Sequence, residues 1–208
     1  ELAYVSKEFQ ADKDIVMAAV SNNGSALRHA SPKLQSDIDI VMAAVTNKGS
    51  ALRFLSRDLR AKRDIVMAAV NNSGSALRSA SEELKEDKDI VLAAVTNVGS
   101  ALYYAHPKFL EDRDIVLTAV SNSGRLLNHI NQKLRSDREI VLAAVSNFGY
   151  ALAFAAPQLQ ADRKIVMAAI NNDGTALEHA SRQLKGDREI VLTAASNFSS
   201  NIDYILSF

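Results

Sequence analysis

The sequence contains no cysteine. This excludes disulfide bonds, thiolate catalysis and cysteine-ligated metal sites, and it leaves the redox compartment open. Long apolar runs are also missing, because runs such as Ile15–Val20 extend over about six residues, whereas a helix that spans a bilayer needs about 20. No signal-like segment opens the chain, which begins at Glu1 rather than at a methionine and so indicates a fragment of a longer protein. We expect a soluble chain with no membrane partner, and its localisation stays open.

Charge of one sign does not dominate the chain. The 24 Lys and Arg residues balance the 24 Asp and Glu residues, which argues against a purely electrostatic partnership with nucleic acid or an anionic membrane. With 48% apolar and 23% charged residues over 208 positions, the composition is that of a folded protein with a substantial core.

The chain is an internal repeat with a period of 25 residues. Ile recurs at this interval from Ile15 to Ile190, eight times without insertion or deletion. Asn and Gly follow the same rule in the loop motif that begins as SNNGSAL at Ser21, and the conserved loop positions are Asn22, Gly24, Asn47, Gly49, Asn72, Gly74, Asn97, Gly99, Asn122, Gly124, Asn147, Gly149, Asn172 and Gly174. A period of this length is typical of a stacked array in which each unit covers its neighbour's apolar face.

Each unit is predicted to contain two short helices. The first begins at a capping Asp12, with Asp14 near the positive end of the helix dipole. Its body, Ile15–Val20, is apolar on every side and is therefore expected to be buried between other helices. We expect this helix to stop where Gly24 adopts the left-handed backbone conformation, with Asn22 bracing the loop.

The second helix is predicted to start at Ser25, with the serine as its cap and Leu27 on its buried face. Pro32 and its two counterparts, Pro107 and Pro157, are the only prolines of the chain and stand at one place in the unit. There we expect a capped single turn to lead into the next repeat.

These patterns predict an all-α fold: an α-solenoid of eight 25-residue helix-loop-helix repeats that forms a right-handed or near-right-handed superhelical array. We interpret residues 1–208 as a single repeat domain. It comprises a partial N-terminal unit (1–11), seven full repeats (12–186) and a divergent C-terminal unit (187–208).

One loop residue changes at nearly every copy while its neighbours stay constant. The variable positions are Asn23, Lys48, Ser73, Val98, Ser123, Phe148, Asp173 and Phe198. Buried structural positions do not accept such different side chains, so we expect exposure. Two interpretations stay open: an unconstrained loop tip, or one chosen side chain per repeat presented to a long partner, which is either a protein or the base edges of duplex DNA.

A second variable position lies in the second helix and is often aromatic, which is typical of binding hot spots. Its members are His29, Phe54, Ser79, Tyr104, His129, Phe154 and His179. We expect partly exposed boundary packing or a ridge for a partner here. Because repeats hold these His residues apart, we predict no metal site. The preceding position is Arg in the first three full repeats only, at Arg28, Arg53 and Arg78.

The unit DKDIVMAAVSNNGSALRHASPKLQS, residues 12–36, resembles the repeats grouped as domain of unknown function 4116. The shared pattern is acid, Lys, acid, two aliphatics, an Ala-rich helix, Gly, Ala-Leu, Ala-Ser and a final Leu. The resemblance extends over essentially the whole chain. It implies an all-helical repeat array and no assigned activity.

The loop half of the unit has a weaker likeness to the DNA-binding repeats of transcription activator-like effectors. In those repeats an acid precedes an apolar helix that ends in Ser-Asn-variable-Gly, and the variable residue reads one base. Asp14, Ser21–Gly24 and Ala26-Leu27 match this pattern. The present unit is about a quarter shorter, and it lacks the second Gly and the Lys that follow the loop there, which leaves phosphate contact unsupported.

The sequence therefore predicts a non-catalytic recognition scaffold that binds a protein partner through the loop tips and the second helix. The alternative is a modular duplex DNA reader that uses the variable loop residue. We expect no enzyme activity, since a catalytic site needs a unique convergent set of groups. We also expect no cofactor, no metal and no small-molecule substrate.

Overall fold

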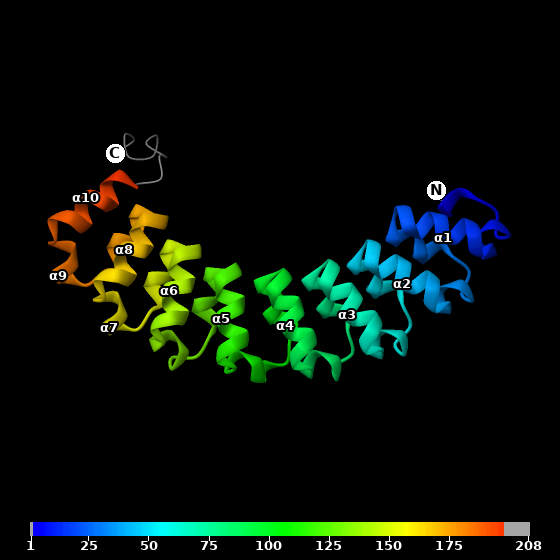
Figure 1. The fold of residues 1–208 in the computed structure, drawn as a ribbon, viewed down its shortest axis with the longest axis horizontal. Helices are drawn as coiled ribbons and strands as arrows, with labels where there is room; N and C mark the ends of the chain where they lie inside the picture. Colours follow the sequence, from blue (N-terminus) through cyan, green and yellow to red (C-terminus); the bar gives the residue numbers. More distant parts are fainter. Residues whose placement is uncertain (1, 198–208) are drawn as a thin grey trace. The chain divides into compact units, whose positions relative to one another are not determined.

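In the computed structural model, residues 2–197 are described, and within them every regular element is a helix. This confirms the all-α prediction of stacked helical repeats. Residues 198–208, which include Phe198 and form the end of the divergent C-terminal unit, lie outside the described residues. The chain divides into two compact units, Glu1–Pro107 and Lys108–Phe208, each of which is a stack of repeats (Figure 1).

Each repeat contains an α-helix, a six-residue 3₁₀ helix and a short connecting turn. The α-helices of unit 1 are α1 (Lys13–Asn22), α2 (Ile38–Asn47), α3 (Arg63–Asn72) and α4 (Lys88–Asn97). Its 3₁₀ helices are η3 (Gly24–His29), η5 (Gly49–Phe54), η7 (Gly74–Ser79) and η9 (Gly99–Tyr104). The shorter 3₁₀ turns are η1 (Leu2–Tyr4), η2 (Phe9–Ala11), η4 (Leu34–Ser36), η6 (Leu59–Ala61) and η8 (Leu84–Glu86).

Unit 2 repeats this plan, and η10 (Pro107–Leu110) lies at the start of it. Its α-helices are α5 (Arg113–Asn122), α6 (Arg138–Asn147), α7 (Pro157–Gln160), α8 (Arg163–Asn172), α9 (Arg182–Lys185) and α10 (Arg188–Ser196). Its 3₁₀ helices are η11 (Gly124–His129), η12 (Leu134–Ser136), η13 (Gly149–Phe154) and η14 (Gly174–His179). The predicted second helix is thus a 3₁₀ helix that begins at the glycine, one residue before the expected serine.

The helices of each unit form two layers. The long α-helices pack on one another in chain order, and so do the six-residue 3₁₀ helices. Within a unit, an α-helix also contacts the 3₁₀ helix of its own repeat and that of the preceding repeat, as α2 contacts η5 and η3. Val16, Val20 and Leu27 are fully buried between the layers, and their counterparts form the core of each unit.

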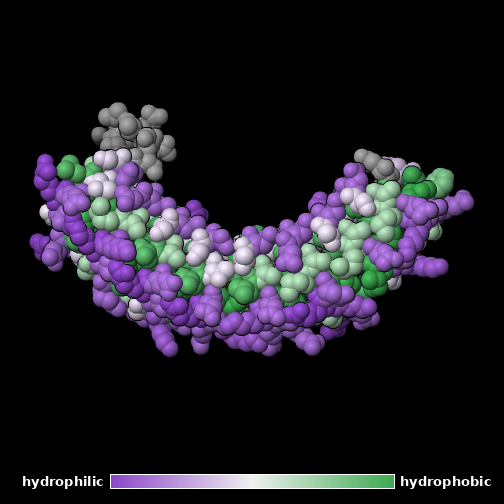
Figure 2. Space-filling model, viewed as in Figure 1, coloured by the Kyte–Doolittle hydropathy of each residue, from purple (hydrophilic) through white to green (hydrophobic). Residues whose placement is uncertain are grey.

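The prediction that the first helix is buried on every side is wrong. Met17, Met42 and Met67 are half-buried, Ala18 is exposed, and Leu92 keeps 37% of its surface exposed. Figure 2 shows the resulting apolar surface over α2 and α3. The reason is that the two layers cover only two sides of each α-helix, so the side that bears Met17 and Ala18 faces solvent.

Capping aspartates start the α-helices, as the sequence predicts. The Oδ1 atom of Asp12 accepts hydrogen bonds from the N–H groups of Asp14 and Ile15, each at 3.0 Å. The same arrangement recurs at Asp37, Asp87, Asp112, Asp137, Asp162 and Asp187. The exception is Lys62 before α3, which has the same extended backbone but no side-chain acceptor.

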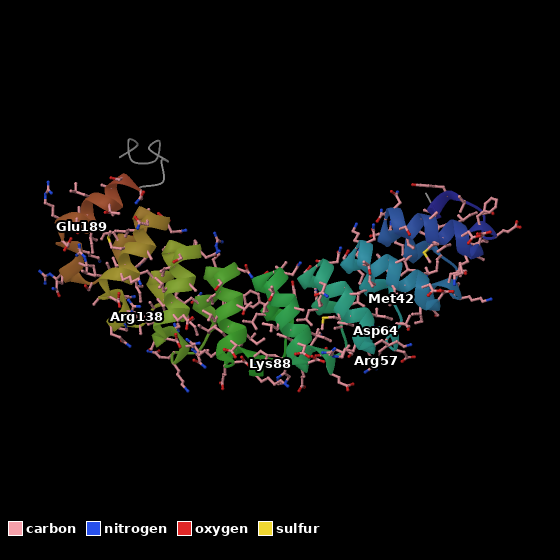
Figure 3. The ribbon with its side chains drawn as sticks, viewed as in Figure 1. Met42, Arg57, Asp64, Lys88, Arg138 and Glu189 are labelled. Carbon is pink, nitrogen blue, oxygen red and sulfur yellow. The ribbon has the colours of Figure 1, made fainter. Side chains whose placement is uncertain are left out.

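Ion pairs connect these caps from one repeat to the next. Arg63 in the first turn of α3 binds Asp87 at 2.9 Å and Asp89 at 2.7 Å in the first turn of α4. In Figure 3 the labelled first-turn residues Asp64 and Lys88 lie at this same edge of unit 1. Lys13 and Arg113 make equivalent pairs with the following repeat.

This series of caps and inter-repeat ion pairs, which we call the ion-pair ladder, is interrupted between α2 and α3 by two changes. Ile38 occupies the position of the cation, and Lys62 occupies the position of the cap that the cation would bind. Ile38 cannot form an ion pair, and its side chain is 40% exposed. This junction therefore lacks both the helix cap and the inter-repeat ion pair.

Candidate binding surface of the 3₁₀ helices

The conserved loop glycine fits closely against the next repeat. A Cβ atom added at Gly24 would collide with the carbonyl oxygen of Ala44, and Gly49 meets Ala69 in the same way. No described residue has a positive φ angle. The prediction of a left-handed glycine is therefore wrong: glycine is required because the backbone of the neighbouring α-helix leaves no room for a side chain.

The conserved loop asparagine connects two repeats rather than bracing its own loop. Oδ1 of Asn47 accepts a hydrogen bond from the N–H of Gly24 at 2.8 Å, and its Nδ2 donates to the carbonyl of Ser21 at 2.8 Å. Asn72 holds Gly49 and Thr46 in the same manner, at 2.7 and 2.9 Å. The pattern recurs where Asn97, Asn147 and Asn172 accept from the N–H groups of Gly74, Gly124 and Gly149.

This asparagine clamp explains why two loop positions are constant. The end of unit 2 departs from it, because Gly174 donates to the backbone carbonyl of Asn197 at 3.0 Å instead of to a side chain. The side-chain amide and the glycine are thus both committed to the repeat interface, and the loop residue between them is not constrained by these contacts.

The variable loop residue occupies the N-cap position of the 3₁₀ helix. Oδ1 of Asn23 accepts from the N–H of Ser25 at 3.0 Å, and Oδ1 of Asp173 accepts from the N–H of Thr175 at 2.9 Å. The prediction that Ser25 is the cap is therefore wrong, because the helix begins one residue earlier than expected and Ser25 lies in its first turn. The Lys48, Val98 and Phe148 side chains make no such cap.

None of the described variable loop residues is buried. Asn23, Lys48 and Val98 are exposed, whereas Ser73, Ser123, Phe148 and Asp173 are half-buried. Phe198 lies outside the described residues. The second-helix set is similar: His129 is exposed, and the half-buried members are His29, Phe54, Ser79, Tyr104, Phe154 and His179.

Unit 2 brings members of both sets together into one aromatic cluster. The ring of Tyr150 contacts those of both Phe148 and Phe154, with ring centroids 6.0 Å and 5.9 Å away. His179 of the next repeat meets Tyr150 edge-on at 4.6 Å. The guanidinium of Arg125, from the preceding repeat, lies 4.7 Å over the Phe148 ring. We call these five residues the aromatic cluster.

Sequence reasoning missed Tyr150 and Arg125, which both stand where most repeats have Ser or Thr. That departure from the repeat is the signal by which they could have been found. Tyr150 is 39% exposed, so the cluster is open to solvent.

Unit 1 presents cations and rings on its 3₁₀ helices instead. Arg53 lies 4.6 Å over the ring of Phe54, and Arg78 lies 6.0 Å from the centroid of the Tyr104 ring in the next repeat. Nε of Arg28 donates to Nε2 of His29 at 2.8 Å. Tyr103 follows Arg78 at the same repeat position, remains 51% exposed, and has a hydroxyl whose pKa is raised by partial burial.

The charged groups at the starts of the α-helices form ion pairs with one another. The Arg113 hydrogen bond lowers the pKa of Asp137 most, partial burial opposes it, and the N–H groups of Ile140 and Glu139 add to the lowering. Among the described residues, no group of three His, Asp or Glu is placed to hold a metal ion. No described helix has both the length and the apolar character to cross a membrane.

The family comparison agrees with this repeat structure. The model of a family described as domain of unknown function (DUF4116) matches residues 1–35, 12–60, 62–110, 112–160 and 162–207. The chain belongs to the DUF4116 family. Each of the full-length matches covers about two of the 25-residue repeats, so the family unit is a repeat pair. No curated protein and no solved structure is similar enough to the chain to count as a match.

Proposed function

We propose that this DUF4116 chain is a non-catalytic recognition scaffold that binds another protein through its 3₁₀ helices. The observation that carries the proposal is the aromatic cluster of unit 2. It assembles Arg125, Phe148, Tyr150, Phe154 and His179 from three successive repeats into one surface-accessible group.

The chemistry of this cluster is that of an interface hot spot. Tyr, Phe and Arg are enriched where protein partners bury most of their binding energy. A T-shaped ring pair such as Tyr150 with His179 restricts the side-chain rotamers before a partner arrives, which reduces the conformational entropy lost on binding.

Catalysis has less support, because the polar groups already have structural partners. The acids at the α-helix starts accept backbone hydrogen bonds and bind cations of the preceding repeat, as Asp137 binds Arg113 at 2.8 Å. The loop asparagines hold the glycines of the preceding repeat. An active site instead requires a convergent set of groups at one place.

Duplex DNA is the alternative partner, and a protein is favoured over it by what the variable loop side chains contact. Asn23 and Asp173 bind the backbone of their own 3₁₀ helices. Phe148 packs between Arg125 and Tyr150. A residue that reads a base edge needs free donors or acceptors directed into the groove.

Two parallel selections on the intact chain test the proposal. One uses a displayed library of random peptides and the other uses randomised duplex DNA at two salt concentrations. We expect a peptide family to be enriched and to be lost when Phe148, Tyr150 and Phe154 are all changed to Ser. We expect no enriched DNA sequence.

The matched control changes Gln132, Gln158 and Gln183 to Ser, since these three residues are exposed in the connecting turns of the same unit. It should retain the peptides, and circular dichroism should show equal helicity in both variants. Equal enrichment on the aromatic variant would refute the proposed surface. If a DNA sequence were enriched in a salt-dependent way and no peptide were enriched, the partner would be duplex DNA and not a protein.

A further inference from the structure

The 3₁₀ helices of unit 1 carry positive charge without compensating acids. Arg28, Arg53 and Arg78, which we call the Arg row, occupy one position in three successive repeats, and all three are exposed. Lys48 adds a fourth exposed cation on the loop before η5. From each α-helix body to the end of the following six-residue 3₁₀ helix, residues 15–29, 40–54 and 65–79 contain no Asp or Glu.

The Arg row contacts an imidazole and aromatic rings and no carboxylate of the described residues. Arg28 donates to His29, Arg53 lies over Phe54, and Arg78 approaches Tyr104. At the starts of the α-helices of the same unit, by contrast, Arg63 is bound by two carboxylates, Asp87 and Asp89. A guanidinium stacked on a ring keeps its N–H donors, so it is oriented and still able to bind a carboxylate with two hydrogen bonds.

The repeat spacing defines the geometry of a ligand for this row. Neighbouring helices pack about 8–10 Å apart. A polyproline II segment advances about 3.1 Å per residue with three residues per turn, so every third side chain lies on one face about 9.3 Å from the last. An acid at every third residue of an extended segment therefore meets one arginine per repeat.

We propose that the Arg row binds an extended acidic segment of a partner protein, with one carboxylate for each arginine. The inference rests on the proposed function of the 3₁₀ surface as a protein-binding face and names the chemistry of its ligand in unit 1. The next position in the row is Tyr103, with Val98, 36% exposed, on the loop before it. The segment therefore carries an apolar residue at the end that reaches η9.

A peptide is favoured over nucleic acid by the size and surroundings of the row. Binding to a nucleic acid draws much of its affinity from the neutralisation of phosphates by Lys and Arg, and a protein that makes about 6–10 phosphate contacts needs a correspondingly large set of cations. Unit 1 offers three arginines and Lys48 on this face, and the whole chain has a formal charge of zero. Three oriented guanidinium groups suit a short segment with three carboxylates.

Fluorescence anisotropy with the full chain tests this inference. The probe is a labelled peptide of three Glu-Pro-Pro triplets, and the control peptide has the same composition with its three Glu residues contiguous. We expect the periodic peptide to bind at least five-fold more tightly than the contiguous one. Changing Arg28, Arg53 and Arg78 together to Gln should weaken the binding of the periodic peptide at least ten-fold.

The matched control changes Lys33, Arg57 and Lys62 to Gln, because these cations are exposed on the turns and the α3 start of the same unit. The affinity of this control variant for the periodic peptide should stay within two-fold of that of the parent. Equal binding of both peptides, or an unaffected Arg-row variant, would overturn the inference. So would a single-stranded oligonucleotide of equal charge that binds more tightly than the peptide and depends on the same arginines.

Failure here is distinguishable from failure of the proposed function. The Arg-row variant leaves the aromatic cluster of unit 2 intact, so the peptide family selected through Phe148, Tyr150 and Phe154 should still bind it. Thermal unfolding of the Arg-row variant should match that of the parent, since the three side chains are exposed and make no ion pairs with described acids.

Discussion

The side-chain amide of Asn47 holds the backbone of Gly24 in the preceding repeat, with its Oδ1 2.8 Å from the glycine nitrogen. Its Nδ2 donates at the same time to the Ser21 carbonyl. One side chain thus satisfies a donor and an acceptor across the interface between two repeats. In a solenoid, stability is the sum of such nearest-neighbour terms and the intrinsic stability of each repeat.

Asn47→Ala should lower the free energy of unfolding by about 1–3 kcal/mol, because it leaves the Gly24 N–H without its partner in a buried loop. Urea denaturation followed by circular dichroism measures this. Asn22→Ala is the matched control, since its side chain makes no hydrogen bond within the described residues and the change should be close to neutral. Equal losses for both variants would contradict the clamp.

Gly49→Ala should destabilise the chain by about 1–3 kcal/mol, because the new methyl group overlaps the Ala69 carbonyl and the two repeats must separate. Gly186→Ala is the control: the nearest atom to its added Cβ is the Gln183 oxygen, 3.5 Å away, which is ordinary contact. That change should be neutral or stabilising by up to about 1 kcal/mol. A neutral Gly49→Ala would show that the repeat contact is looser than described.

Acid should weaken the chain through the capping aspartates. The pKa of Asp137 is lowered chiefly by Arg113, and those of Asp37 and Asp187 are lowered chiefly by Lys13 and Arg163. A lowered folded-state pKa gives stability that is complete above the unfolded value of about 3.9 and is lost as the pH falls through the folded value.

The urea midpoint should therefore be steady from about pH 7 to pH 5 and fall below about pH 4. Asp137→Asn keeps a capping oxygen and removes the titrating group, so its midpoint should fall less on acidification than that of the parent. The interpretation would be wrong if the variant lost as much stability in acid as the parent.

Restoring the interrupted ladder should stabilise unit 1. The backbone of Lys62, at φ −87° and ψ 119°, matches that of the capping Asp12 at −82° and 121°. Lys62→Asp should therefore add a cap worth about 0.5–2 kcal/mol. Adding Ile38→Arg should contribute about 0.2–1 kcal/mol more through the new ion pair.

A double-mutant cycle separates the two terms. Ile38→Arg alone places a cation beside Lys62 and should give no gain, so the coupling between the two changes should be favourable. Lys62→Asn in place of Lys62→Asp supplies the cap without the charge and should reduce the coupling. Strict additivity of the two changes would argue against an ion pair across this junction.

The sequence predicted the features that depend on neighbours within one repeat. The period of Ile15 and its counterparts gave the repeat length, and Asp12 was correctly assigned as a cap, because a cap acts on N–H groups two and three residues ahead. The predicted left-handed conformation of Gly24 is wrong, because the group that requires glycine is the Ala44 carbonyl in the next repeat. Within a single repeat, the end of a helix is the only visible reason for a glycine.

The candidate surface was predictable only in part. Phe148 and Phe154 stand out in the sequence, but their connection through Tyr150 and the approach of Arg125 and His179 depend on how three repeats stack. Tyr150 and Arg125 differ from the Ser that most repeats have at their position. In an array this regular, the departures from the repeat mark the surface, while its constant residues hold the stack together.

The most direct test of the central claim is to map which residues touch a bound peptide. A photo-crosslinking amino acid is placed at Tyr150, on the 3₁₀ surface, or at Arg182, exposed in α9 of the same unit. Each protein is then irradiated with the peptide family selected on the intact chain. We expect crosslinks from position 150 and none from position 182. Crosslinks of equal yield from both positions, or from position 182 alone, would contradict the assignment of binding to the 3₁₀ helices.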